Sequence, residues 1–208
     1  DLEMGYIRSF YDVMEAEAGY LRRAMELLAR EYDEELALLG VRLPRADQIP
    51  CLRFDEAKRL AAEKYGCPIR DPYDLEPEEE ARIGRYAREE YGSDFVFVTH
   101  YPSRKRPFYA MDDPDDPRYT LSFDLLLRGM EVTTGGQRIH DYAAQAAKME
   151  ARGMDPGDFD SYLMIHRCGM PPHGGLGIGL ERLTMQLCGL DNIRYCSLFP
   201  RDRGRLEP

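Results

Sequence analysis

Long apolar runs and secretion signals are both missing from this sequence. No run of about 18 apolar residues occurs, so we expect no segment that crosses a membrane. The first residues, DLEMGYIRSF, are acidic and mixed, whereas a signal peptide begins with basic residues followed by an apolar stretch. We therefore expect a protein without membrane association.

Cysteines are few, and their spacing excludes the common cysteine-based sites. The five cysteines form no CxxC pair and no spacing typical of zinc ligands. An odd, scattered set of thiols is typical of a reducing compartment. The sequence therefore predicts no structural zinc and a cytoplasmic location.

An excess of basic residues is absent as well. The chain has 28 Lys and Arg against 38 Asp and Glu, a formal net charge of −10. Indiscriminate nucleic-acid binding needs a broad basic surface, so this class is disfavoured, although a local basic patch for RNA is compatible with the composition. With 43 % hydrophobic residues in 208, the chain has ample material for one large buried core.

The periodicity predicts helices before and after a group of strands. Helical spacing and capping residues indicate five helices and a further one after the glycine-rich segment: 12–32, 55–65, 77–91, 141–152, 159–167 and from 180 onward. Residues 94–102 and 107–111 have strand composition, and 120–140 contains two strands broken at Arg128-Gly129. The fold class is therefore α+β, an antiparallel sheet flanked by helices.

Two acidic residues flank the Arg128-Gly129 turn. If these two residues form the turn, Leu126 lies opposite Glu131 and Asp124 opposite Thr133. If the turn shifts back by one residue, Asp124 faces Glu131 directly. Either register puts both carboxylates on one face, roughly 5 to 8 Å apart, where they suit a magnesium ion shared with a phosphate. A solvated edge hairpin with two acids is the alternative.

The stretch GGLGIGLERL, residues 174–183, is glycine-rich and then becomes helical. It matches neither the Walker GxxxxGK[ST] loop nor the Rossmann GxGxxG motif. Gly175, Gly177 and Gly179 occupy every second position, which favours a strand with one bare face on which a flat ring can lie. Arg182, in the first helical turn, suits polyphosphate because its fork binds two oxygens. An ordinary surface arginine is the alternative.

These segments resemble the catalytic domain of class II aminoacyl-tRNA synthetases, most closely that of archaeal-type aspartyl-tRNA synthetases. The stretches YPSRKRPFYAM, FDLLLRGMEVTTGGQRIH, GMPPHGGLGIGLERL and DNIRYCSLFPRDRGRL occur in the order and spacing of that family. GLGIGLERL resembles its third signature motif. The resemblance implies a six- to seven-stranded antiparallel sheet, activation of aspartate by ATP, and transfer of the aspartyl group to tRNA.

The resemblance also implies roles for individual residues at the nucleotide end. Glu131, with Asp124 and Thr134, matches positions that hold Mg²⁺ and ATP. Gly179, Leu180, Glu181 and Arg182 match the ATP-binding third motif, with Arg182 on the γ-phosphate. Glu131 and Arg182 are thus the implied catalytic residues.

The same resemblance assigns an aspartate-binding end. Arg138 matches the arginine that pairs with the aspartate side chain, and Tyr109 matches a tyrosine of the site wall. Thr134 stands where the family often has serine, near the amino acid. From the residues alone, Arg138 beside two acids suits recognition of a carboxylate, and an ordinary ion-pair partner is the alternative.

Several family features have no counterpart in the sequence. The first motif, which forms the family's dimer, most of the second motif and the amino-terminal anticodon-binding barrel are missing; DLEM matches only the tail of the second motif. Leu127 stands where the family often has phenylalanine. We therefore expect residues 1–208 to be a single, amino-terminally truncated catalytic domain whose complete enzyme is a homodimer. A stand-alone paralogue that makes asparagine, and an inactive nucleotide-binding remnant, are the alternatives.

Overall fold

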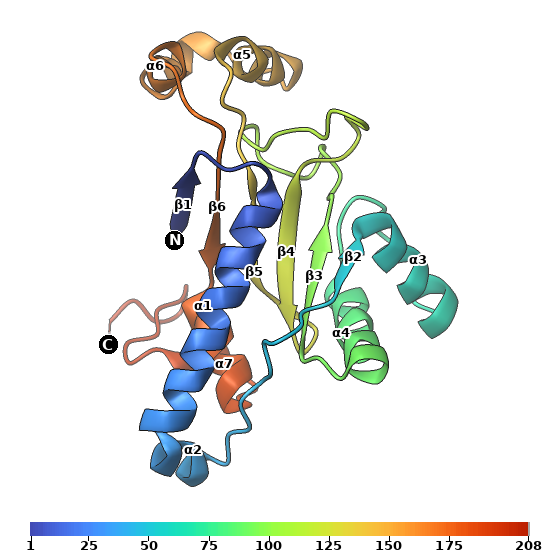
Figure 1. The fold of residues 1–208 in the computed structure, drawn as a ribbon, viewed down its shortest axis with the longest axis vertical. Coiled ribbons are helices and arrows are strands. Elements are labelled where there is room, and N and C mark those ends of the chain that lie inside the picture. The colour runs from blue at the N-terminus through green and yellow to red at the C-terminus, as the bar shows by residue number, and fades with distance from the viewer. Residues whose placement is uncertain (208) are drawn as a thin grey trace.

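Six strands form one sheet in the computed structural model, which describes residues 1–207 (Figure 1). Their order across the sheet is β1-β6-β5-β4-β3-β2. All neighbouring strands are antiparallel except β2 and β3, which are parallel. The strands are β1 Leu2–Gly5, β2 Cys51–Arg53, β3 Phe95–Thr99, β4 Ser122–Leu127, β5 Met130–Gln137 and β6 His173–Ile178. The predicted α+β class is confirmed, and the parallel edge strand β2 was not predicted.

Seven α-helices surround the sheet in the described part of the chain. They are α1 Phe10–Glu31, α2 Asp33–Leu39, α3 Phe54–Tyr65, α4 Pro77–Tyr91, α5 Tyr142–Ala151, α6 Asp160–Arg167 and α7 Leu180–Cys188. The predicted helices all form, and α2 is an addition. Helix α1 begins two residues before the predicted Asp12 because Ser9 is the N-cap and Asp12 closes the capping box from the third helical position.

The predicted strand at residues 107–111 is wrong. This segment consists of turns and makes only an isolated bridge, between Ala110 and Arg138. Its aromatic composition reflects packing rather than a ladder, because Phe108 contacts the rings of Phe159 and Tyr162 beneath α6 at 5.7 and 5.5 Å between centroids. Residues rich in Phe and Tyr fit any half-buried surface, so composition alone does not distinguish the two.

Helices cover the two faces of the sheet unequally. Helices α1 and α7 pack on one face, over Phe97, Phe123 and Leu125. On the opposite face α3 and α4 pack over β2, β3 and the end of β4, where Val98 and Leu126 are buried. Figure 1 shows α3 and α4 gathered beside β2 and β3, and α5 and α6 beyond the ends of β5 and β6. The α4 face of β5 and β6 is where the polar residues of the next section lie.

Two glycines let α4 approach the β4–β5 hairpin. Arg128 and Gly129 both have positive φ, 52° and 83°, which is the geometry of a two-residue type I′ turn. A Cβ on Gly84 of α4 would lie 2.4 Å from the Gly129 backbone nitrogen, a distance that no side chain tolerates. The close approach places the preceding turn of α4 against the first residues of β5.

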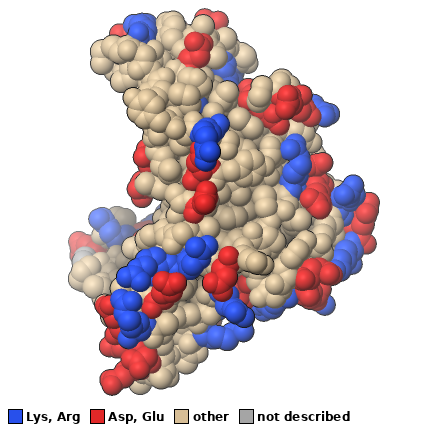
Figure 2. Space-filling model, viewed as in Figure 1, with Lys and Arg blue, Asp and Glu red and all other residues tan. Residues whose placement is uncertain are grey.

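Charges of both signs are interspersed on the surface. Figure 2 shows lysine and arginine alternating with aspartate and glutamate around the edges of the face that it displays, without a large patch of one sign there. Within residues 1–207, no helix combines the length and the apolar character needed to cross a membrane.

One acidic side chain lies in the core on the α1 face. Glu17 of α1 is only 1 % exposed, and neither of its carboxyl oxygens has a hydrogen-bond partner within the described residues. Burial is the main cause that raises the pKa of Glu17 to about 7; the nearby Thr133 hydroxyl opposes this rise, and the charge of Asp124 adds to it. The folded protein therefore favours the protonated carboxyl group.

This raised pKa predicts a pH-dependent stability. Protonated Glu17 stabilises the fold fully below about pH 4.5, the ordinary pKa of a glutamate in the unfolded chain. That stabilisation is lost as the pH rises through about 7, the pKa of Glu17 in the folded protein. Between pH 4.5 and 8, the free energy of unfolding of wild type should fall relative to that of Glu17→Gln by on the order of 3 kcal/mol. Urea unfolding of both chains across this range measures the difference. Parallel pH profiles would show that Glu17 does not titrate in this way.

Candidate active site

A bulge in β5 brings three polar residues to one face of the β4–β5 hairpin. Leu126 pairs with Glu131 and Asp124 pairs with Thr134, so β5 contributes one more residue than β4 between these pairs. The Thr134 hydroxyl donates a hydrogen bond to the Glu131 carboxylate at 3.2 Å. Both carboxylates thus lie on one face, as predicted.

Neither predicted register describes the whole hairpin. The first register is correct at the Arg128-Gly129 turn, where Leu126 lies opposite Glu131, but its pairing of Asp124 with Thr133 is wrong. The second register, with Asp124 opposite Glu131, is wrong as well. Because of the bulge, Thr133 is buried towards Glu17 on the α1 face, and Thr134 takes its place.

Asp124 forms a buried ion pair with Arg106. The Arg106 Nη2 atom lies 2.7 Å from Asp124 Oδ2, and the two side chains are only 11 % and 5 % exposed. The guanidinium carbon lies 3.9 Å from the centre of the Tyr101 ring, within range of a cation–π interaction. Asp124 Oδ1 is buried and has no hydrogen-bond partner among residues 1–207. This oxygen is therefore an orphaned acceptor with almost no exposed surface.

Glu131 lies between an arginine and a second glutamate. Its carboxylate is 3.1 Å from Arg182 Nη1, and the same nitrogen donates to the Glu131 carbonyl at 3.0 Å. From α4, the Glu80 carboxylate accepts the Glu131 backbone N–H at 3.1 Å. Burial is the largest cause that raises the pKa of Glu131, followed by the Asp124 charge, and burial raises the pKa of Glu80 to about 7. The site thus favours additional positive charge.

The start of α7 carries the remaining residues of the predicted ATP-binding motif. The Gly179 N–H donates to the Val132 carbonyl of the bulge at 2.8 Å, which fixes the helix start beside β5. Leu180 and Glu181 follow with exposed side chains. Of this motif, Arg182 is the side chain that reaches Glu131.

Strand β6 presents a strip of glycines on the same face. Gly177 pairs with Thr134 and Gly175 with Gly136, so both glycines share the face of Thr134. A Cβ on Gly177 would approach only a carboxylate oxygen of Asp1, at 3.0 Å. At Gly175 the Glu3 side chain already covers the backbone. The predicted bare strip therefore exists, open at Gly177 and covered at Gly175.

Arg138 lies on this face at the far end of β5. Its Nη2 atom is 3.1 Å from the Glu3 carboxylate of β1, and its guanidinium carbon lies 5.1 Å from the centre of the Tyr109 ring. The three side chains line a cavity of about 430 Å³, together with Tyr162 and His173. Arg138 is four residues beyond Thr134, roughly 13 Å along an extended strand. The site therefore has two ends joined by β5.

The donor atoms at the first end suit a hard cation such as Mg²⁺. The unpartnered Asp124 oxygen and the partly exposed Glu131 carboxylate are the kind of ligand that this ion takes. No group of three or more potential metal ligands occurs within residues 1–207. Protein side chains alone therefore do not enclose an ion here, and phosphate oxygens would have to complete its coordination.

Three residues of the site were not found from the sequence: Arg106, Glu80 and Glu3. Arg106 stands in the basic run RKRP, where nothing distinguishes it from its exposed neighbours. Glu80 is one of three consecutive glutamates in α4, and only the close packing at Gly84 selects it. Glu3 is the acid in DLEM, and the strand-like alternation of that stretch was the only sequence feature that could have placed it on the face of the site.

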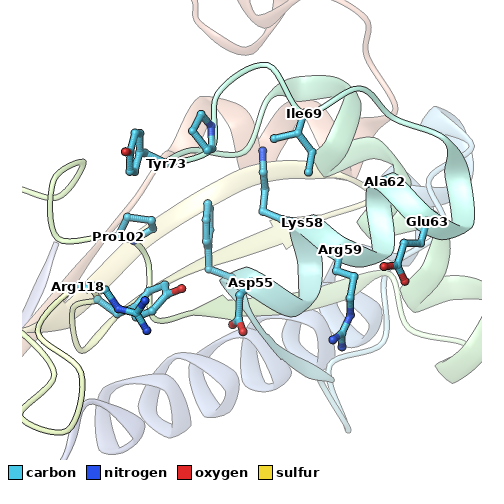
Figure 3. A pocket seen from close by; sticks show the side chains of 12 residues that line it. Asp55, Lys58, Arg59, Ala62, Glu63, Ile69, Tyr73, Pro102 and Arg118 are labelled. Carbon is cyan, nitrogen blue, oxygen red and sulfur yellow. The ribbon is translucent and has the colours of Figure 1, made fainter.

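A larger cavity lies away from these residues. It has a volume of about 520 Å³ and is lined by α3 and by Ile69, Tyr73, Pro102 and Arg118, among others (Figure 3). Lys58 reaches into it, but its ammonium group is already bound to Glu79 and to two backbone carbonyls. The cavity contains none of the predicted site residues.

The buried ion pair at Asp124 gives a prediction that a double-mutant cycle can test. Removing either partner leaves an uncompensated buried charge, so Arg106→Met and Asp124→Asn should each cost about 3 kcal/mol of unfolding free energy. The double variant should cost about 2 kcal/mol less than the sum. The exposed pair Arg118–Asp116 is the matched control, and its cycle should give a much smaller coupling because solvent screens the two charges. A coupling near zero at Arg106 and Asp124 would contradict this geometry.

Comparisons with known proteins identify the family. The family model for tRNA synthetases class II (D, K and N) matches residues 1–203. The aspartate–tRNA(Asp/Asn) ligase of Thermus thermophilus is 47 % identical over 209 residues, which covers 100 % of this chain and 49 % of the relative. That of Aeropyrum pernix is 44 % identical over 210 residues, or 100 % of this chain and 48 % of the relative. The chain spans about half the length of these curated relatives.

Solved structures of tRNA synthetases have the same fold as this chain. The aspartyl-tRNA synthetase of Entamoeba histolytica superposes with a TM-score of 0.93 at 32 % identity, covering 99 % of this chain and 43 % of that one. The asparaginyl-tRNA synthetase of Pyrococcus horikoshii, in complex with asparaginyl-adenylate, gives 0.88 at 31 % identity and covers 99 % and 47 %. The chain therefore belongs to the class II tRNA synthetases of the D, K and N group.

Proposed function

We propose that this chain is part of the catalytic domain of an aspartate–tRNA ligase, which activates aspartate with ATP and transfers it to tRNA. The observation that carries the proposal is the arrangement on the open face of the sheet. At one end Arg182 pairs with Glu131, and Thr134, opposite Asp124, donates to the same carboxylate. Arg138 lies at the other end, and the glycines of β6 lie alongside. The relatives named aspartate–tRNA ligases support the choice of substrate.

At the nucleotide end, we assign ATP to the glycine strip and to α7. Adenine would lie on the bare backbone at Gly177, and the Arg182 guanidinium would bind the γ-phosphate through two oxygens. Glu131, Asp124 and Thr134 would hold Mg²⁺, with phosphate oxygens as its remaining ligands. When bound, the ion neutralises negative charge on the triphosphate. The backbones of Gly179, Leu180 and Glu181 would adjoin the nucleotide.

At the other end, we assign the amino acid to Arg138, Tyr109 and Thr134. Arg138 is 18 % exposed and pairs with the more exposed Glu3, so an incoming side-chain carboxylate can compete for the guanidinium group. Tyr109 supports the guanidinium through its ring, 5.1 Å away. A fixed cation at this position favours aspartate over a neutral side chain of the same shape.

The chemistry then requires positioning and charge neutralisation. An α-carboxylate oxygen of aspartate attacks the α-phosphorus of ATP, the bond from that phosphorus to the bridging oxygen breaks, and pyrophosphate leaves. A ribose hydroxyl of tRNA next attacks the aspartyl carbonyl carbon and releases AMP. Holding the reactants in line and placing Arg182 near the departing charge supply the rate enhancement, with little acid–base catalysis.

Partners and location follow from the same proposal. We infer that the complete enzyme binds aspartate, ATP and tRNA, and that it is a homodimer. One relative, from Caenorhabditis elegans, is named as cytoplasmic, which supports a cytoplasmic location for this protein. The domain assignment, a single catalytic domain over residues 1–208 that lacks its amino-terminal part, is a proposal of the same kind.

Pyrophosphate exchange in the complete gene product tests this function. We expect exchange into ATP that depends on aspartate and Mg²⁺, followed by aspartylation of tRNA. Glu131→Gln and Arg182→Met should each lower kcat/KM for exchange at least about a hundredfold, because each removes charge stabilisation at the reacting phosphates. Arg22→Met, an exposed arginine on α1, is the matched control and should leave exchange unchanged.

Other outcomes identify the alternatives. Binding of ATP and Mg²⁺ without aspartate-dependent exchange would overturn the proposal in favour of an inactive remnant. Formation of free asparagine from aspartate, ATP and ammonia, without tRNA, would overturn it in favour of an asparagine-forming paralogue.

A further inference from the structure

The segment Ser103–Ala110 carries two residues of the candidate site. It belongs to the connection between β3 and β4 and contains no strand. Arg106 reaches Asp124 at the nucleotide end, 2.7 Å away, and Tyr109 lies against Arg138 at the amino-acid end. A shift of this segment would therefore move one residue at the nucleotide end of the site and one at its amino-acid end.

Side chains from α5 hold the backbone of this segment. Gln145 Nε2 donates to the Phe108 carbonyl at 3.0 Å, and Lys148 Nζ donates to the Ala110 carbonyl at 2.7 Å. Arg152, the C-cap residue of α5, donates through Nη1 to the Arg106 carbonyl at 2.6 Å. We call Gln145, Lys148 and Arg152 the α5 clamp. Their spacings of three and four residues place them on one side of the helix.

The acceptors of the clamp are carbonyls outside the sheet ladder. The bonds from Gln145 and Lys148 are partly buried, and the bond from Arg152 is exposed. A carbonyl that is removed from water without a partner costs free energy, so the partly buried carbonyls of this segment depend on side-chain donors. Two of the three clamp donors are cationic, and charge-assisted hydrogen bonds are the stronger kind. Lys148 Nζ also bonds Asp112 at 2.6 Å, and its side chain is only 9 % exposed.

Packing reinforces the clamp from the adjoining helix. The Phe108 ring meets Phe159 and Tyr162 at the start and middle of α6, and the Tyr162 hydroxyl faces the Gln145 amide oxygen at 3.4 Å. His166 of α6 lies 3.3 Å from the Ile139 carbonyl, next to Arg138. The α5–α6 pair therefore contacts the segment and the end of β5 together. Figure 1 shows this pair beyond the end of the sheet, away from α4 and α7.

We propose that Lys148 and Arg152 are positioning residues: the α5 clamp fixes the Ser103–Ala110 segment so that Arg106 meets Asp124 and Tyr109 meets Arg138. The clamp residues touch neither reactant in this scheme and act through Arg106 and Tyr109. The catalytic part of this inference rests on the proposed function, whereas the mechanical part concerns the fold alone.

The test compares Lys148→Met and Arg152→Met with Glu150→Gln in the complete gene product. Glu150 is an exposed residue of the same helix and makes no ion pair within the described residues, so it controls for changes to α5. Hydrogen exchange is measured at the amides of Arg106 and Ala110, which bond to Ser103 and Pro107. Steady-state kinetics of pyrophosphate exchange give KM for ATP and for aspartate separately.

Each clamp variant loses two charge-assisted hydrogen bonds, so both should speed amide exchange in the segment at least about tenfold and leave β4 and β5 unchanged. KM should rise about tenfold for both substrates. Arg152→Lys should show a smaller loss than Arg152→Met, because lysine keeps the charge and a donor nitrogen but lacks the fork that reaches two carbonyls. Glu150→Gln should match wild type in every measurement.

Two results would overturn the clamp. Unchanged amide exchange and unchanged KM in both variants would show that the segment holds its position without α5. Faster exchange spread over the whole sheet, with a lower melting temperature and no recovery in Arg152→Lys, would show a general structural role. If the complete protein showed no aspartate-dependent pyrophosphate exchange, the proposed function would be wrong. Amide hydrogen exchange in the segment would still show whether the α5 clamp holds it.

Discussion

One extra residue in β5 determines the geometry of the site. The bulge at Val132 turns Thr134, instead of Thr133, to the side of Asp124 and Glu131, and leaves the Val132 carbonyl free to accept the N–H of Gly179. That hydrogen bond fixes the start of α7 beside β5 and thereby places Arg182 within reach of Glu131. A regular hairpin would separate these groups, since a shift by one residue reverses the face of every later side chain.

Buried charge on this face is balanced from outside the sheet. The Asp124 charge adds to burial in raising the pKa of Glu131, and arginines from the β3–β4 connection and from α7 lie against the two carboxylates. Glu80 adds a third carboxyl group behind Glu131. Such a site is preorganised for a ligand that combines a divalent cation with phosphate, because the protein alone leaves its acidic groups incompletely neutralised.

The sequence predicted what depends on local pattern. The helices, the Arg128-Gly129 turn and the alternation of glycines in β6 follow from spacing and turn chemistry, and the structure confirms them. The bulge at Val132 was missed because strict alternation has no signal for one inserted residue. Arg106 and Glu80 were missed because their partners lie 18 and 51 residues away and are selected by packing. The role of each site residue stays a prediction.

A single open face for both substrates is the central claim, and a crystal structure of the complete gene product with Mg²⁺ and a non-hydrolysable ATP analogue tests it most directly. The account predicts adenine on the backbone of β6 at Gly177, the terminal phosphate at Arg182, and the ion in contact with Glu131 and Asp124. A nucleotide in the cavity beside α3, or an ion that touches neither carboxylate, would contradict it.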